Sequence, residues 1–154
     1  TTNPNLPFNK FAAIYDGGSV FGISGEISFA AGEKIDVLLG AKYNAYSLDS
    51  LPEPYHKPSS EMKLGLSFLA TKKIRIWSEV YYYGARKALD LKSSPAKDID
   101  LDGFIDLNAG VDYKLTDSFL VFLSLNNILN TDYQRYYNYP VHGIQVMGGL
   151  MYKF

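Results

Sequence analysis

Hydrophobic and polar residues alternate along much of this chain with a period of two. In residues 105–115, every odd-numbered position is apolar or aromatic, and every even-numbered position is Asp, Asn, Gly or Lys. Successive side chains of a β-strand point to opposite faces, so this alternation predicts a strand with one apolar and one polar face. Residues 144–154 show a similar pattern and predict another strand at the end of the sequence.

The same alternation recurs upstream and predicts an antiparallel all-β fold. The predicted strands lie at about 21–29, 35–44, 62–68, 74–82, 105–115, 119–126 and 144–154. An eighth strand, at about residues 8–15, has the weakest pattern. We find no helical period, and no run of about 18 apolar residues that could form a transmembrane helix.

The connections between these strands fall into two classes. Short polar turns are expected at 31–34, 71–73 and 116–118. Longer links lie at about 48–60, 87–102 and 129–142. Short turns at one end and long loops at the other are typical of outer-membrane barrels, with a tight Asp16-Gly17-Gly18 hairpin as the exception on the long-loop side. We therefore predict an antiparallel transmembrane β-barrel of about eight strands, either a complete small barrel or the last strands of a larger one.

Alternation alone also fits a soluble barrel such as a lipocalin. The charge carried by the polar face distinguishes a membrane barrel from a soluble one. Its charges are few and balanced: Glu26, Asp36, Glu79, Asp106 and Asp112 against Lys42, Lys63, Arg75, Lys114 and Lys153. Balanced charges can pair inside a narrow barrel, whereas a soluble exterior usually carries denser charge. Tyr and Phe also gather toward the strand ends, as in the girdles of membrane barrels. The membrane barrel is favoured, and a soluble ligand-binding barrel stays open as an alternative.

Composition excludes several classes of function. The 154 residues include 13 Tyr and 9 Phe but no Cys, so disulfides, thiolate metal sites and a cysteine nucleophile are excluded. A net charge of -1 offers no basic surface for nucleic acid. The first residues lack the basic start and apolar run of a signal peptide, so either a signal was removed or the sequence is an internal fragment.

Few residues suggest catalytic or metal chemistry. His56 and His142 have no partner at metal-ligand spacing and are expected to be solvated loop residues. The triplet Asp98, Asp100 and Asp102 lacks the acidic residue that completes an EF-hand loop. It could therefore bind a cation only loosely, at the surface. No Ser occurs in a recognisable nucleophile context. We therefore predict no enzyme activity, no metal site and no cofactor.

One loop carries candidate ligand-binding residues. Tyr133, Arg135, Tyr136, Tyr137 and Tyr139 cluster in the last long link. Tyrosine rings beside a guanidinium could stack on a sugar or another ligand at the mouth of a barrel. The alternative is that these rings belong to the interface girdle and pack within the loop.

The C-terminal third resembles the end of the barrel of TonB-dependent receptors. Residues 125–133 (LNNILNTDY), the Tyr139-Pro140 turn and residues 148–154 (GGLMYKF) are similar to the closing motif of that family. Pro140 is followed by Val141, so the Arg that is usual near this turn is missing. The plug domain and TonB-contacting box of the family have no counterpart, and residues 1–154 are interpreted as a single barrel domain.

This resemblance implies a transporter in the outer membrane of a Gram-negative cell, which would help to carry a nutrient inward. The implied partners are outer-membrane lipid, the barrel assembly machinery, and the remaining strands and plug of a larger receptor. Leu150, Tyr152 and Phe154 look like the signal that the assembly machinery reads, or they are only lipid-facing girdle residues. The alternative function is a self-contained eight-stranded barrel with a structural or surface-binding role.

Overall fold

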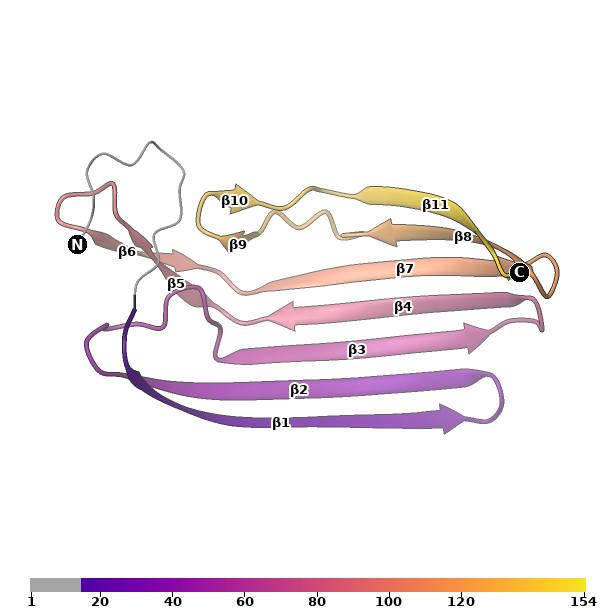
Figure 1. Ribbon diagram of the computed structural model, residues 1–154, viewed down its shortest axis with the longest axis horizontal. Coiled ribbons are helices and arrows are strands. Elements are labelled where there is room, and N and C mark those ends of the chain that lie inside the picture. The colour runs from indigo at the N-terminus through magenta and orange to yellow at the C-terminus, as the bar shows by residue number, and fades with distance from the viewer. Residues whose placement is uncertain (1–14) are drawn as a thin grey trace.

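Seven long strands form one antiparallel sheet in the computed structural model, which describes residues 15–154 (Figure 1). Their order is β1 (Gly18–Ala31), β2 (Ile35–Leu48), β3 (Ser60–Leu69), β4 (Ile74–Tyr83), β7 (Phe104–Lys114), β8 (Phe119–Asn126) and β11 (Gln145–Tyr152). Long strands that follow one another in the chain are neighbours in the sheet, so the predicted antiparallel all-β class is confirmed. Within the described residues, no helix is long and apolar enough to cross a membrane.

Every strand predicted between residues 21 and 154 is present in this sheet. β1 and β2 extend further toward the long loops than the alternation indicated, to Gly18 and Leu48. The expected eighth strand at residues 8–15 lies outside the described residues except for Tyr15, which is not in a strand. The expected hairpin at residues 16–18 would need that strand as one of its two arms. The Asp16 carboxylate accepts hydrogen bonds from the backbone N–H groups of Ser50 (3.1 Å) and Leu51 (2.8 Å) in the β2–β3 loop.

Short turns and long loops lie at opposite ends of the sheet, as predicted (Figure 1). Two of the long loops contain hairpins that the sequence pattern did not predict. One pairs β5 (Arg86–Asp90) with β6 (Lys97–Leu101), and the other pairs β9 (Gln134–Tyr136) with β10 (Tyr139–Pro140). These strands are only two to five residues long, and alternation is not diagnostic over so few positions.

The apolar face of the sheet is open to its surroundings. Along β1, the side chains of Phe21, Ile23 and Ile27 are 71%, 64% and 66% exposed. The register places Ile27 opposite Leu39 of β2, so the apolar band continues from strand to strand. An exposed apolar surface of this extent is unfavourable in water but matches the lipid-facing band of a membrane barrel. The apolar face of the sheet is therefore compatible with the lipid-facing surface of the predicted membrane barrel.

Burial of apolar side chains is confined to the long-loop end. Among the described residues, the buried hydrophobic side chains are Ala88, Leu101 and Phe104. Ala88 and Leu101 belong to the β5–β6 hairpin, and Phe104 is the first residue of β7. The packed part of the molecule therefore lies where the long loops meet the ends of the strands.

The polar face carries ion pairs between neighbouring strands, as its balanced charge predicted. Lys42 Nζ lies 3.6 Å from Glu61 Oε1, and these two residues are register partners on β2 and β3. Arg75 Nε donates a 2.8 Å hydrogen bond to Asp112 Oδ2 across β4 and β7. Pairs of this kind contribute about 0.2–1 kcal/mol each in antiparallel sheets.

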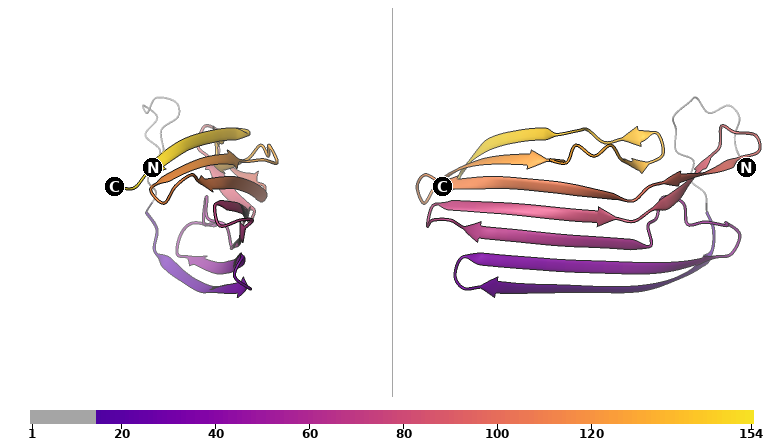
Figure 2. Two further views of the ribbon diagram at one scale, coloured as in Figure 1. Left: turned by 90° about the vertical axis from the view of Figure 1, so that its right-hand side faces the viewer. Right: turned by 180° about the vertical axis from the view of Figure 1, so that it is seen from behind.

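β1 and β11 are the two edges of the sheet. Within residues 15–154 neither edge has a partner strand, and the sheet is curved and open rather than closed (Figure 2). Unpaired backbone N–H and C=O groups are prohibitive in the hydrocarbon layer of a membrane. Both edge strands therefore need partner strands before this sheet can be stable in a lipid bilayer.

Candidate ligand-binding site

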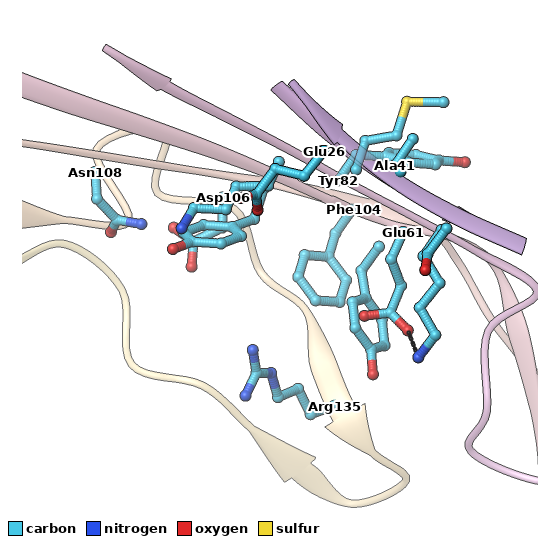
Figure 3. Close-up of a pocket in the computed structure, with 16 residues that line it drawn as sticks. Glu26, Ala41, Glu61, Tyr82, Phe104, Asp106, Asn108 and Arg135 are labelled. Atoms are coloured by element: carbon cyan, nitrogen blue, oxygen red, sulfur yellow. Dashed lines mark ion pairs between the residues drawn. The ribbon is translucent and has the colours of Figure 1, made fainter. Parts of the chain in front are cut away.

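A pocket of about 780 Å³ lies against the polar face of the sheet (Figure 3). Its lining includes Lys42, Tyr81 and Asp106, which point to that face because of the strand alternation, and Tyr81 is the register partner of Asp106. Arg135 of β9 also lines the pocket, so the last long loop folds back over the sheet. A volume of this size is typical of sites for small-molecule ligands.

Charged side chains of both signs line the pocket. Two of its lysines are neutralised by carboxylates of neighbouring strands, Lys42 by Glu61 and Lys63 by Glu79. Arg135 differs, because within residues 15–154 no carboxylate lies at ion-pair distance from its guanidinium. The guanidinium carbon lies 5.9 Å from the centre of the Tyr83 ring. Arg135 can therefore offer its charge to an anionic group of a ligand.

Asp106 connects the pocket wall to the last long loop. The Tyr133 hydroxyl donates a 2.8 Å hydrogen bond to Asp106 Oδ2. Burial, followed by this bond, raises the pKa of Tyr133 to about 12, so the phenol keeps the proton that it donates. Asp106 Oδ1 is buried and has no hydrogen-bond partner among the described residues, which leaves one carboxylate oxygen able to accept a hydrogen bond.

A stack of aromatic rings holds the loop in the same position. The rings of Phe104 and Tyr133 are nearly parallel, with centroids 3.6 Å apart and an interplanar angle of 10°. Phe104 is also stacked on Tyr83, with centroids 5.5 Å apart. Since Tyr83 ends β4 and Phe104 begins β7, this aromatic stack fastens the last long loop to the sheet.

Arg86 fixes the backbone of the hairpin that carries Arg135. Its side chain is 5% exposed, and its Nε donates a 3.3 Å hydrogen bond to the Arg135 carbonyl, while Nη2 donates to the Gln134 carbonyl. Nη1 lies 3.4 Å from the carbonyl oxygens of Gly84 and Asp102. Arg86 thus joins three segments of the chain, and its charge is stabilised by carbonyl dipoles rather than by a carboxylate of the described residues.

The β2–β3 loop packs against the β5–β6 hairpin. Lys87 Nζ forms a 2.7 Å ion pair with Glu53 Oε1, and the Lys87 carbonyl accepts a 2.7 Å hydrogen bond from the backbone N–H of His56. The Tyr55 hydroxyl donates a 2.8 Å hydrogen bond to Asp98 Oδ1. Burial and this bond raise the pKa of Tyr55 to about 12. The loop and the hairpin therefore form one packed unit.

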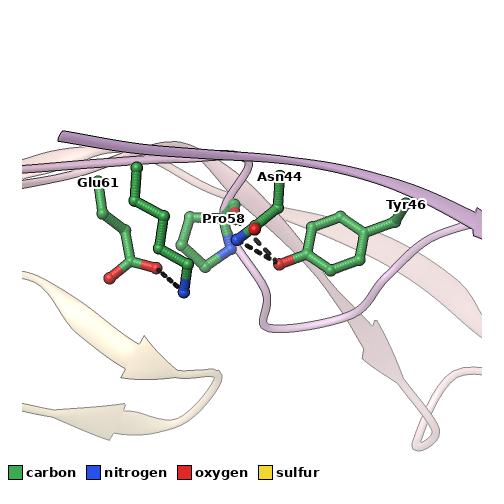
Figure 4. A network of polar contacts seen from close by, with 5 residues as sticks. Asn44, Tyr46, Pro58 and Glu61 are labelled. Atoms are coloured by element: carbon green, nitrogen blue, oxygen red, sulfur yellow. Dashed lines mark hydrogen bonds and ion pairs between the residues drawn. The ribbon is translucent and has the colours of Figure 1, made fainter. Parts of the chain in front are cut away.

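The base of the β2–β3 loop is tied to the polar face of β2 (Figure 4). Asn44 is buried, and its Nδ2 donates a 3.2 Å hydrogen bond to the Tyr46 hydroxyl. That hydroxyl lies 3.4 Å from the Pro58 carbonyl, to which it donates. The backbone N–H of Asn44 donates to the Ser59 carbonyl at 2.8 Å. These bonds hold the end of the loop beside the pocket residue Glu61.

Asn127 closes the base of the last long loop. It is buried and has a left-handed backbone, with φ of 48°, which Asn tolerates better than most residues. Its Nδ2 donates hydrogen bonds to the carbonyls of Thr131 (3.2 Å) and His142 (3.1 Å), and its Oδ1 accepts one from the Thr131 N–H (3.0 Å). Its own N–H donates to Asn108 Oδ1 on β7. The Asn127 side chain therefore joins the two ends of the loop, and its backbone N–H joins them to the sheet.

The five predicted ligand-binding residues do not share one position. Arg135 lines the pocket, and Tyr133 is bonded to a carboxylate that lines it. Tyr136 and Tyr139 are exposed and Tyr137 is half-buried, and these three are not among the residues that line the pocket. A role for any of the five in ligand binding stays a prediction.

Several residues that build this site are not identified as site residues by the sequence pattern. Alternation places Lys42 and Asp106 on the polar face, but it assigns no role in a site to Arg86 or Phe104. A signal for Phe104 was present, because aromatic residues gather at the strand ends. The position of Arg86 depends on contacts between three loops, which no local pattern encodes.

The acidic triplet Asp98, Asp100 and Asp102 lies in the second long link, and its carboxylates are not grouped as metal ligands. Asp98 accepts the hydrogen bond of Tyr55. In the part of the chain that the structure describes, no group of three His, Asp or Glu side chains is placed to hold a metal ion.

The C-terminal residues lie on the outward apolar face. Leu150 and Tyr152 are exposed on β11, and the Tyr152 ring lies 6.4 Å from that of Phe154. This position fits a lipid-facing girdle and equally a recognition signal for assembly, so the assembly role stays a prediction.

Comparisons with known proteins find similarity in structure only: no protein-family model and no curated protein sequence matches the chain. The ferripyoverdine receptor of the outer membrane of Pseudomonas aeruginosa, bound to ferripyoverdine, matches 98% of this chain with a TM-score of 0.77 and 15% identity. The ferric-catecholate import receptor Fiu from Escherichia coli K12 matches 90% of it with a TM-score of 0.71 and 16% identity. The iron transporter FrpB from Neisseria meningitidis matches 88% of it with a TM-score of 0.70 and 21% identity.

This chain spans 22%, 22% and 23% of the lengths of those three structures. These structures are described as two receptors and an iron transporter, and the ferripyoverdine receptor is described as a protein of the outer membrane. In its fold, this chain is similar to a segment of the barrel of TonB-dependent receptors.

Proposed function

We propose that the chain forms part of the wall and long loops of a TonB-dependent receptor-like transporter that takes up a nutrient. The pocket on the polar face carries this proposal, because it combines a buried carboxylate oxygen with an uncompensated guanidinium from the last long loop. In outer-membrane barrels the long loops are extracellular. The pocket would therefore face the side from which a nutrient arrives.

We infer a ferric chelate as the first ligand to test. Structures with the same fold are described as receptors for ferripyoverdine and for ferric catecholates. An anionic chelate with aromatic groups would find a cation in Arg135 and rings in the aromatic stack of Tyr83, Phe104 and Tyr133. Guanidinium groups and rings bind such ligands through charge-assisted hydrogen bonds and stacking.

We also infer that the strands completing the barrel belong to the same receptor. Support comes from the two unpaired edges of the sheet and from the length of the matching structures, which is more than four times that of this chain. Hydrogen bonding of both edges to further strands would satisfy the backbone in lipid. A plug within that larger barrel would face the same polar surface as the pocket.

The intact mass of the native polypeptide, isolated from the membrane in which it is made, tests this interpretation directly. A mass several times larger than 17.2 kDa is the expected result. A mass near 17.2 kDa would instead establish the self-contained small barrel with a structural or surface-binding role.

Uptake of chelates loaded with radioactive iron tests the transport function. Deletion of the gene in the native host should abolish uptake of at least one chelate, and the wild-type gene should restore it. Arg135→Ala should restore only a small part, whereas Lys97→Ala, which removes an exposed cation outside the pocket, should restore it fully. Unchanged uptake in the deletion strain across siderophore classes would contradict a ferric chelate as the ligand.

A further inference from the structure

His56 lies where three long loops meet. It belongs to the β2–β3 loop, its N–H donates to the Lys87 carbonyl of β5, and its ring centre lies 5.4 Å from that of Tyr136 in β9. Its Nδ1 atom is buried and has no hydrogen-bond partner among the described residues. The imidazole is therefore half-buried between the loops, with Nδ1 shielded from solvent, whereas the sequence-based expectation for this residue is a solvated side chain.

The surroundings of His56 favour its neutral form. Burial, followed by the charge of Arg86, lowers the pKa of His56 from its ordinary value. Protonation would add a buried N–H without an acceptor among residues 15–154, and a second cation beside Arg86, whose partners within the same residues are carbonyls and aromatic rings. Both consequences are costly in a buried site.

Nearby carboxylates are already engaged and cannot readily neutralise a charged His56. The titratable groups on the elements that pack against it are Arg86, Lys87 and Asp90 of β5, Arg135 and Tyr136 of β9, and Asp49, Glu53, Tyr55 and Lys57 of its own loop. Asp90 accepts hydrogen bonds from the Lys92 N–H and the Ser93 hydroxyl. Glu53 is paired with Lys87 at 2.7 Å, and Asp98 of β6 accepts the hydrogen bond of Tyr55. The cations therefore dominate the charge around the imidazole.

We propose that His56 is an acid-sensitive latch on the pocket. In its neutral form it lets the three loops pack together, so that Arg86 holds the β9–β10 hairpin and Arg135 over the pocket. In its protonated form it repels Arg86 and releases that hairpin. This proposal concerns the regulation of the pocket and rests on the proposed function for the role of the pocket.

The direction of the pH dependence follows from the lowered pKa. A histidine whose pKa is lower in the folded state contributes stability that is complete above its ordinary pKa, 6.5. That stability is lost as the pH falls from this value through the lowered pKa. The loop assembly should therefore open on acidification and close again on neutralisation.

Hydrogen–deuterium exchange of the full-length protein tests the latch without requiring transport. Exchange is measured at about pH 7.5 and about pH 5, each corrected for the intrinsic rate of free amides. Wild-type residues 130–142 and 53–57 should exchange several-fold faster at the acidic pH, while the strands stay protected. Because no nutrient is involved, failure of this test is distinguishable from failure of the proposed function.

The matched variants are His56→Asn and His142→Asn. His56 has φ of 63°, and Asn tolerates this left-handed conformation without carrying a titratable charge. His56→Asn should abolish the acid-induced increase in exchange, and His142→Asn, which changes the exposed second histidine, should leave it intact. An increase that persists in His56→Asn would overturn the proposal.

If the His56→Asn variant does not fold, a direct titration of His56 in the wild-type protein still tests the proposal. The imidazole of His56 in the wild-type protein can be followed by NMR after isotope labelling of histidine. A His56 pKa below its ordinary value of 6.5, together with loop opening over the same pH interval, is the expected result. A His56 that titrates at the ordinary value, or without any change in the loops, would refute the latch.

Discussion

Trp77 of β4 packs against Gly110, its register partner on β7, so closely that no side chain fits between them. A Cβ atom on Gly110 would lie 2.5 Å from Trp77 Cζ2 and 2.8 Å from the Leu123 carbonyl oxygen. Phe122 of β8 and Gly149 of β11 repeat the arrangement, with a distance of 2.5 Å from a Cβ to the ring. Aromatic side chains of the polar face therefore lie over glycines of neighbouring strands. In β-sheets, this arrangement covers the backbone that a glycine leaves exposed.

Gly110→Ala should destabilise the barrel. The new methyl group must displace a ring and a backbone carbonyl, and overpacking of this kind costs about 1–3 kcal/mol. The measurement is reversible urea unfolding of the full-length protein in lipid vesicles. Gly25→Ala is the matched control, because nothing lies within 4 Å of a Cβ at that position. Equal unfolding curves for the two variants would show that the Trp77 contact is not restrictive.

Asn127→Ala should loosen the last long loop. The change removes three side-chain hydrogen bonds and leaves backbone groups of Thr131 and His142 without their partner, at a cost of about 1–3 kcal/mol. Faster proteolytic cleavage within residues 128–142 of the folded protein would report this loosening. Asn127→Gly relieves the left-handed backbone but not the lost bonds. If the glycine variant resists cleavage as well as the wild type, then only the backbone conformation matters.

Alkaline pH should detach Tyr133 from Asp106. The pKa of Tyr133 is raised from 10.0 to about 12, so the folded state holds this proton more tightly than the unfolded state does. The associated stability is complete below pH 10 and is lost as the pH rises toward 12. Ultraviolet titration of the full-length protein should show a late-ionising tyrosine that disappears in Tyr133→Phe.

Tyr55 provides the control for this titration, because its pKa is also raised to about 12 by burial and by Asp98. Tyr55→Phe should remove a second late-ionising group and leave that of Tyr133 in place. Loss of both groups in either single variant would mean that the two loops titrate as one unit.

Phe154→Ala should lower the amount of assembled protein in the outer membrane. Phe154 is exposed beside Tyr152 at the end of the outward face, where an assembly factor can reach it. The measurement is the fraction of the protein that reaches the outer membrane in folded form, judged by heat-modifiable mobility in gels. Lys153→Ala changes the adjacent residue on the other face and should assemble normally. Normal assembly of Phe154→Ala would leave this residue only a girdle role.

The strands and the direction of their two faces were predictable from the sequence alone. The alternation in residues 105–115 sets which side chains of β7 share a face, because the period of a strand is two. The short turns and the antiparallel neighbours follow for the same reason, since consecutive strands joined by a short turn pair with one another. The local pattern therefore determined the strands of the sheet and which side chains share each of its two faces.

The candidate site depended on tertiary structure. Arg86, His56 and Arg135 come from three loops far apart in the sequence, and no periodicity links them. Their positions follow from backbone carbonyls and rings that meet only when the ends of β4 and β7 are side by side. The sequence alone determined that this chain makes strands with one apolar and one polar face, because that property repeats every second residue. Only the tertiary structure decided which loop residues meet over the polar face, because loop packing is set by contacts distant along the chain.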